Sequence, residues 1–223
     1  MIVLAFDTAL GACSAGLWCD GTVLAHESVV MAQGQAEALM SMIERVMSAA
    51  GLTYAGLDRI AVSVGPGSFT GLRVGIATAR GLAMAADKPA IGITTTHALA
   101  DCVPAHERQG RRVMAVIDSK RGDVFAQLFD TNGAVLSEIV NVAYETLPAM
   151  CGDGALIAVG DATERAVAVL GSRAMRSSVS NVCSIESLAR LASARNPDAA
   201  GPLPVYARAP DVTLRADGGM LRP

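Results

Sequence analysis

The glycine-rich segment 65–75 holds the residues of this sequence best suited to binding chemistry. It reads Gly-Pro-Gly-Ser-Phe-Thr-Gly-Leu-Arg-Val-Gly and lies between an apolar run typical of a strand and a stretch with helical periodicity. Such a turn lets a backbone approach closely, and the helix N-terminus behind it suits an anion. The candidate phosphate contacts are Gly65, Gly67, Ser68 and Thr70. The alternative is a tight turn in which Ser68 or Thr70 caps the helix, because neither a Walker A lysine nor the spacing of a dinucleotide-binding turn is present.

Two carboxylates that follow predicted strands are the other candidates for phosphate chemistry. Asp7 and Thr8 come directly after the apolar run Ile2–Phe6. Asp118 follows the run Val113–Ile117, with two basic residues close behind. Where a hairpin follows such a strand, the carboxylate faces a cleft and can position a metal-bound phosphate. An aspartate also simply closes a strand at a turn, so both alternatives stay open.

The sequence gives little support to metal or nucleophile chemistry. The five cysteines are scattered without a Cys-x-x-Cys pair, and no two of the three histidines are four residues apart. A Gly-x-Ser-x-Gly motif is also absent. We therefore predict reduced cysteines, no metal site and no catalytic residues.

The elements that must position these residues alternate as strands and helices. Up to residue 93 the order is β-β-β-α-β-α-β, and from Arg111 the opening pattern of a strand ending in aspartate and then a hairpin recurs. This order predicts an α/β fold of two lobes, each with a mixed sheet flanked by helices. The predicted domains are a first lobe at 1–105, which carries two helices expected to bind a partner protein, a compact second lobe at 106–195, and a loose, proline-rich tail at 196–223. The predicted strands are Ile2–Phe6, Ala12–Trp18, Thr22–Val30, Arg59–Val64, Pro89–Ile93, Val113–Ile117, Val124–Phe129, Val135–Val140 and Leu156–Val159, and the predicted helices are Gln35–Ala50, Gly71–Ala86, Thr163–Leu170 and Ser187–Ala194.

Composition excludes several classes of protein. The 223 residues are 52% hydrophobic and 17% charged, which excludes general disorder. A net charge of −3 disfavours a free-standing nucleic-acid binder. The longest stretch without a charged side chain, Ile60–Leu72, is shorter than the ~18 residues of a membrane helix, and no signal peptide is apparent. We expect a cytoplasmic protein with no membrane contact.

Two of the predicted helices carry more apolar or small surface than one core contact needs. The apolar arc of Gln35–Ala50 spans roughly 200°, about twice a normal core-facing stripe. In Gly71–Ala86, small residues recur every four positions and leave one face bare. Either both helices pack deeply inside the chain, or this surface binds a partner protein. The candidate partner contacts are Leu39, Met40, Met42, Ile43, Met47, Gly71, Gly75 and Ala79.

The chain resembles the TsaB family, the non-catalytic partners in bacterial synthesis of threonylcarbamoyladenosine (t6A) on tRNA. The resemblance covers nearly the whole chain. It rests on Ile2–Thr8, Gly65–Gly75, the helix ending at Gly51-Leu52, Val116–Asp118 and Pro204–Arg208. It implies the actin/sugar-kinase/Hsp70 (ASKHA) fold, with two RNase-H-like lobes. It also implies that Asp7, Thr8 and the 65–70 turn are at most vestigial nucleotide contacts, and Ala9, where serine is common, weakens even that assignment.

The resemblance also implies a scaffold role and a set of partners. The catalytic relative TsaD transfers threonylcarbamoyl to the adenosine next to the anticodon, and carries a His-x-x-x-His metal motif. No histidine occurs in the corresponding stretch 33–38. We expect a heterodimer with TsaD, a contact with the ATPase TsaE, a homodimer when alone, and tRNA met only indirectly. We expect this chain to bind no cofactor of its own. Whether ATP or ADP binds at an interface shared with a partner stays an open alternative.

Two enzyme classes remain as alternatives. The first is an ATP-dependent phosphotransferase or hydrolase of the ASKHA fold, which would need a second-lobe adenosine pocket that the sequence does not reveal. The second is a metallopeptidase, which the missing histidines disfavour.

Overall fold

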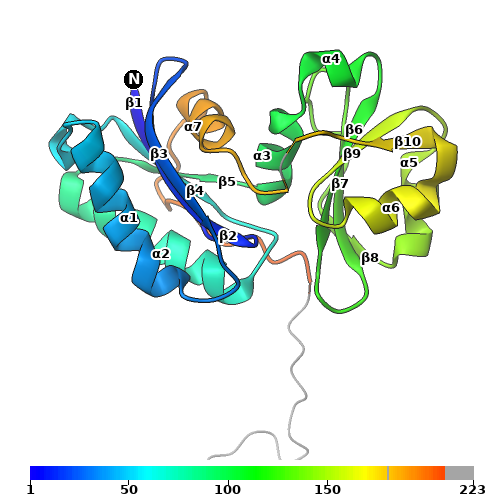
Figure 1. The fold of residues 1–223 in the computed structure, drawn as a ribbon, viewed down its shortest axis with the longest axis horizontal. Helices are drawn as coiled ribbons and strands as arrows, with labels where there is room; N and C mark the ends of the chain where they lie inside the picture. Colours follow the sequence, from blue (N-terminus) through cyan, green and yellow to red (C-terminus); the bar gives the residue numbers. More distant parts are fainter. Residues whose placement is uncertain (180, 209–223) are drawn as a thin grey trace, which may run out of the picture.

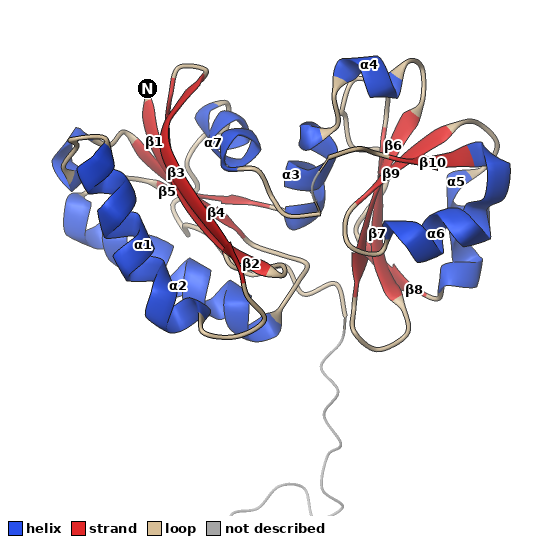
Figure 2. Cartoon of the chain, in the orientation of Figure 1, coloured by secondary structure: helices blue, strands red, loops and turns tan. Residues whose placement is uncertain are grey.

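The computed structural model describes residues 1–179 and 181–208, which form two five-stranded mixed sheets (Figures 1 and 2). The first sheet has the order β3-β2-β1-β4-β5 and the second the order β10-β9-β6-β7-β8. In each sheet the first strand in sequence pairs antiparallel with the next strand and parallel with a later one. The strands are β1 (Ile2–Asp7), β2 (Ala12–Cys19), β3 (Thr22–Val30), β4 (Arg59–Ser63), β5 (Ala90–Ile93), β6 (Arg112–Asp118), β7 (Val124–Phe129), β8 (Val140–Val142), β9 (Leu156–Val159) and β10 (Ala174–Arg176). This repeated topology confirms the predicted duplication and fold class.

Helices cover the outer faces of both sheets and fill the space between them (Figure 2). The helices are α1 (Gln35–Ala49), α2 (Phe69–Ala86), α3 (Thr95–Cys102), α4 (Ala105–Arg108), α5 (Leu147–Cys151), α6 (Thr163–Leu170) and α7 (Ile185–Ser193). The pair α1 and α2 packs on the first sheet, and α5 and α6 pack on one another beside the second. The chain enters α2 through a serine cap and leaves α1 at a left-handed glycine, Gly51.

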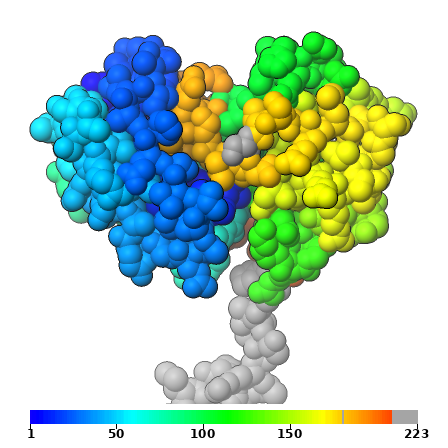
Figure 3. Space-filling view, in the orientation of Figure 1, coloured from blue at the N-terminus to red at the C-terminus, as the bar shows by residue number. Residues whose placement is uncertain are grey.

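The helix α7 corrects the predicted boundary of the second lobe. It packs against β1, β2 and β4 of the first sheet, although it was expected in the second lobe at 106–195. Its buried residues share one core cluster with both sheets and with Leu99 of α3. In the space-filling view, the yellow and orange chain leading into α7 bridges the two lobes (Figure 3). Amphipathic periodicity marks a buried helical face but does not say which sheet will cover it.

Two other expectations fail within the described residues. The predicted strand Val135–Val140 is reduced to one bridge between Phe129 and Val135, and the pairing strand β8 begins only at Val140. The tail is not loose up to residue 208. Val205 N donates to Val64 O at 2.7 Å, and Arg80 donates to Ala200 O at 3.1 Å. The remainder of the predicted tail, 209–223, lies outside the described residues.

A histidine lies where α3, the end of α7 and the second sheet meet. His97 Nδ1 is 3.1 Å from Arg195 Nη2, and its ring centroid is 5.5 Å from that of Phe129. Burial lowers the pKa of His97, and the charges of Arg195 and Arg190 lower it further, against an opposing contribution from Asp101. A neutral imidazole can accept the hydrogen bond from Arg195, whereas an imidazolium would repel the guanidinium.

We therefore predict a loss of stability on mild acidification. Because the folded pKa lies below the unfolded value of about 6.5, the unfolded chain binds the proton first. The contribution of neutral His97 to the free energy of unfolding is complete above pH 6.5, and it declines as the pH falls toward the pKa of His97 in the folded protein. Thermal unfolding at pH 7.5 and pH 5.5 should show a larger drop for the native chain than for His97→Gln. An equal drop in both proteins would contradict this role of His97.

Candidate functional site

The glycine-rich turn packs tightly against the segment that follows β1. Ser68 N donates to Ala9 O at 2.7 Å, and Gly71 N donates to Ser68 Oγ at 3.2 Å, so Ser68 is the cap of α2. A Cβ at Gly67 would stand 2.3 Å from Ala9 O. The turn therefore uses its glycines for close contact with its own chain.

The small-residue stripe of α2 faces inward, which corrects its assignment as a partner surface. Thr8 Oγ1 donates to Gly71 O at 2.7 Å. A Cβ at Gly71 would stand 1.9 Å from Thr8 O, and one at Gly75 would stand 2.6 Å from Thr8 Oγ1. Ala79 is completely buried in the same core. The bare face of α2 thus lets the helix lie close to the end of β1.

The wide apolar arc of α1 is also covered by the chain itself. Four of its five candidate partner contacts are buried, and only Met40, at 38% exposure, reaches the surface. The buried four are Leu39, Met42, Ile43 and Met47. Both the first sheet and α2 pack against α1, so two internal neighbours account for the arc. The prediction that these four residues bind a partner is wrong.

The surface of the first-lobe helices is formed by residues that the sequence analysis did not select. On α2, the exposed positions Arg73, Ala77, Gly81 and Met84 recur at helical spacing, and Met84 is 86% exposed. Within the described part of the chain, a Cβ at Gly81 would meet no atom within 4 Å. We call Met40, Ala77, Gly81 and Met84 the outer helical face. The sequence does contain a signal for this face: small and apolar residues recur on α2 in a second stripe, separate from the buried stripe of Gly71, Gly75 and Ala79.

Asp7 and Thr8 are buried and hold the local structure. Asp7 Oδ1 accepts from Ala9 N at 3.0 Å and from Ser63 Oγ, while Oδ2 has no hydrogen-bond partner in the described part of the chain. Burial raises the pKa of Asp7, and its hydrogen bonds oppose the rise. Both side chains are fully shielded, so the structure does not place them as accessible phosphate contacts.

A cleft of about 580 Å³ lies between the lobes, and part of the predicted phosphate set borders it. From the first lobe it is lined by Gly67, Ser68 and Phe69, and from the second by Asp118, Lys120 and Asp161. The other predicted contacts in the turn do not line it. Gly65 packs against Val205 O, where an added Cβ would stand at 2.7 Å, and Thr70 is exposed.

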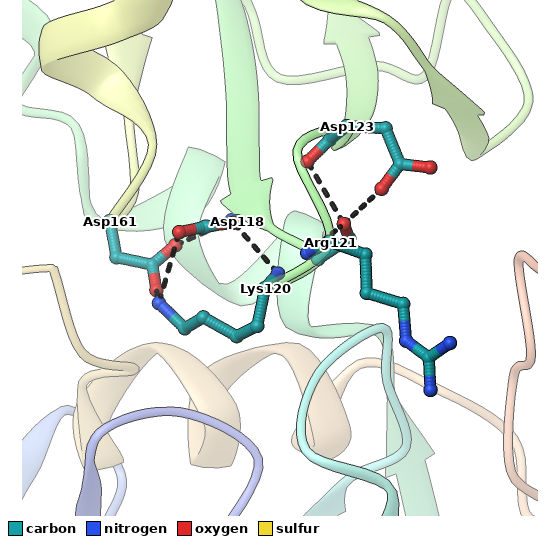
Figure 4. Close-up of polar contacts among 6 residues, drawn as sticks. Asp118, Lys120, Arg121, Asp123 and Asp161 are labelled. Carbon is teal, nitrogen blue, oxygen red and sulfur yellow. Dashed lines mark hydrogen bonds and ion pairs between the residues drawn. The ribbon is translucent and has the colours of Figure 1, made fainter.

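An exposed lysine, Lys120, pairs with two carboxylates that line this cleft (Figure 4). Lys120 Nζ lies 3.3 Å from Asp118 Oδ2 and 3.1 Å from Asp161 Oδ2. Asp118 N also donates to Asp161 Oδ1 at 2.8 Å, which joins β6 to the loop after β9. Burial opposes the charge of Lys120, but Asp161 and Asp118 together raise its pKa above the ordinary value. The lysine thus supplies the positive charge that a bound cation would otherwise bring to these carboxylates.

Clustered metal ligands and membrane-length apolar helices are both absent from residues 1–179 and 181–208. In these ranges no three His, Cys, Asp or Glu side chains gather at one point. The same ranges contain no helix whose length and hydropathy would allow it to cross a bilayer.

Comparison with known proteins finds relatives whose names refer to tRNA modification. The family model described as "TsaD: tRNA N6-adenosine threonylcarbamoyltransferase" matches residues 29–165. The tRNA threonylcarbamoyladenosine biosynthesis protein TsaB of Escherichia coli is 39% identical over 126 residues, which cover 56% of this chain and 53% of that protein. The Haemophilus influenzae protein of the same name is 36% identical over 126 residues, covering 56% and 52%. The chain thus spans about half the length of the curated relatives it matches.

Solved structures agree with this relationship over most of the chain. YeaZ from Pseudomonas aeruginosa superposes with a TM-score of 0.79 at 28% identity, covering 92% of this chain and 99% of that one. An activator of 2-hydroxyisocaproyl-CoA dehydratase from Clostridium difficile, with bound ADPNP, shares the fold at a TM-score of 0.50 and 11% identity, covering 89% and 99%. The predicted two-lobed fold class is therefore confirmed. The chain belongs to the TsaD family, and within that family it is a TsaB-type protein.

Proposed function

We propose that this protein is a non-catalytic subunit that acts with TsaD and TsaE in forming t6A on tRNA. Three lines of support are the family match, the names of the relatives and the structural likeness to YeaZ. In this assembly TsaD transfers the threonylcarbamoyl group and TsaE supplies ATPase activity. The present chain holds the partner in its active form, in the cytoplasm, and meets tRNA as part of the complex.

The outer helical face is the observation that carries this proposal. Gly81 lies inside α2, where glycine costs about 0.5–1 kcal/mol relative to alanine, and no contact among residues 1–179 and 181–208 needs that position bare. Met84 next to it is 86% exposed, although it is an apolar side chain. A second protein that packs closely on α2 explains both features, because a glycine lets another backbone approach.

The same face suits a related partner. TsaD and this chain share the first-lobe fold, so α1 and α2 of one protein can pack against the same helices of the other around a pseudo-two-fold axis. A stable interface of this kind buries on the order of 1,600 Å². In the absence of TsaD, a second copy of the chain can take the same place as a homodimer. Any ATP or ADP would lie at the shared interface, because Lys120 already pairs with the cleft carboxylates.

Reconstitution tests the function directly. Unmodified tRNA transcript is incubated with TsaD, TsaE, ATP and a threonylcarbamoyl donor, with or without this chain, and t6A is measured by mass spectrometry of digested tRNA. We expect t6A only when the chain is present, and no ATP turnover or t6A from the chain alone. Equal yields without the chain would refute the activating role. Synthesis by the chain alone would refute the non-catalytic one.

A further inference from the structure

Two aromatic side chains are exposed side by side, and one of them, Phe69, lines the cleft. Among the four Phe, three Tyr and one Trp of the chain, only Phe69 and Tyr206 are at least half exposed, at 54% and 50%. Their ring centroids are 5.6 Å apart with an interplanar angle of 36°. The guanidinium carbon of Arg73 lies 3.8 Å from the centroid of Phe69. These three side chains form what we call the stacking surface.

The backbone holds the stacking surface in place. Phe69 and Arg73 are in the first turns of α2, whose cap is Ser68. Tyr206 follows Val205, whose N–H is bound to Val64 O at 2.7 Å and whose carbonyl leaves no room for a side chain at Gly65. Two residues later, Arg208 lies 3.5 Å from Asp123 of the second lobe. The rings are therefore presented by fixed elements, which lowers the entropy lost when a ligand binds.

The surroundings of the stacking surface suit a polyanion with flat rings. The sequence of α2 contains two arginines and no acidic residue. One of these arginines, Arg73, lies against the face of the Phe69 ring. Unpaired RNA bases stack on aromatic rings and on arginine planes, while their phosphates bind lysine and arginine.

We propose that Phe69, Arg73 and Tyr206 bind an unpaired stretch of tRNA directly, by stacking against a base. This inference rests on the proposed function, in which tRNA is the substrate of the complex. It replaces the expectation that the chain meets tRNA only indirectly. With a net charge of −3 the isolated chain binds RNA weakly, so the contact contributes within the complex with TsaD.

The test measures tRNA affinity of the complex between this chain and TsaD. The probe is a fluorescein-labelled, unmodified tRNA transcript, followed by fluorescence anisotropy at fixed salt. Tyr206→Ala should weaken binding about 5- to 100-fold, the loss typical of one stacked base, and Tyr206→Trp should retain it. Leu203→Ala is the matched control, because Leu203 is 54% exposed in the same tail but lies outside the stacking surface. Arg73→Gln should weaken binding and also reduce its dependence on salt.

Size-exclusion chromatography of each variant with TsaD separates the outcomes. An intact complex with weakened tRNA binding supports the inference. Native tRNA affinity for Tyr206→Ala overturns it, while t6A synthesis by the native complex leaves the proposed function standing. Loss of the complex between a variant and TsaD also overturns the inference, because it would show that the stacking surface binds protein and not tRNA. If the native chain forms no complex with TsaD, both proposals fail together.

Discussion

Replacing Gly71 by alanine is expected to destabilise the protein by about 3 kcal/mol or more. The new Cβ would stand 1.9 Å from the carbonyl oxygen of Thr8, which is backbone and cannot rotate away. Removing this steric clash would require α2 to move away from the end of β1. That movement would break the hydrogen bond from Thr8 Oγ1 to Gly71 O and disturb the cap at Ser68.

The same helix contains a matched control. Gly81→Ala adds the same atoms at a position where none of the described residues comes within 4 Å of the new Cβ, so it should stabilise the isolated chain by about 0.5–1 kcal/mol. Urea unfolding followed by circular dichroism compares the two variants with the native protein. Equal midpoints for Gly71→Ala and Gly81→Ala would show that α2 does not approach β1 as closely as described.

A charge on the outer helical face is expected to prevent assembly with TsaD. Ala77 is exposed on α2 between Arg73 and Gly81, so Ala77→Asp should leave the isolated chain folded. In the complex the carboxylate would lose its water without gaining a partner, at a cost of ~2 kcal/mol or more. Affinity for TsaD should fall about 30-fold or more, and t6A synthesis at limiting concentrations should fall with it.

Ala168→Asp is the control for this effect. Ala168 is also an exposed helical alanine, but it belongs to α6 of the second lobe. Isothermal titration calorimetry with TsaD should give native affinity for this variant, and circular dichroism should show both variants folded. Native affinity for Ala77→Asp would place the interface elsewhere on the chain.

Local patterns in the sequence predicted the fold well, because they report on neighbours along the chain. Alternating apolar runs and turn residues located the strands β1 to β7, and the repeated strand-aspartate-hairpin pattern indicated the duplication. The packing of α7 against the first sheet could not be predicted from such local patterns. Its apolar face fits either sheet, and only the three-dimensional path of the chain from β10 decides between them.

The candidate site was less predictable, since burial depends on contacts between distant segments. The apolar arc of α1 correctly indicated two contacts, but both are internal. The glycine stripe of α2 correctly indicated a close backbone approach, yet the neighbour is Thr8 of the same chain. The contact of Phe69 with Tyr206 joins residues 137 positions apart, so no local pattern could reveal it.

Hydrogen–deuterium exchange of this chain, with and without TsaD, tests the central claim most directly. It reports on the native sequence and needs no substitution. The account predicts that TsaD slows exchange in peptides from α1 and α2 and leaves peptides from α6 unchanged. Protection confined to the second lobe, with α1 and α2 exchanging as in the free chain, would contradict the assignment of the outer helical face as the partner surface.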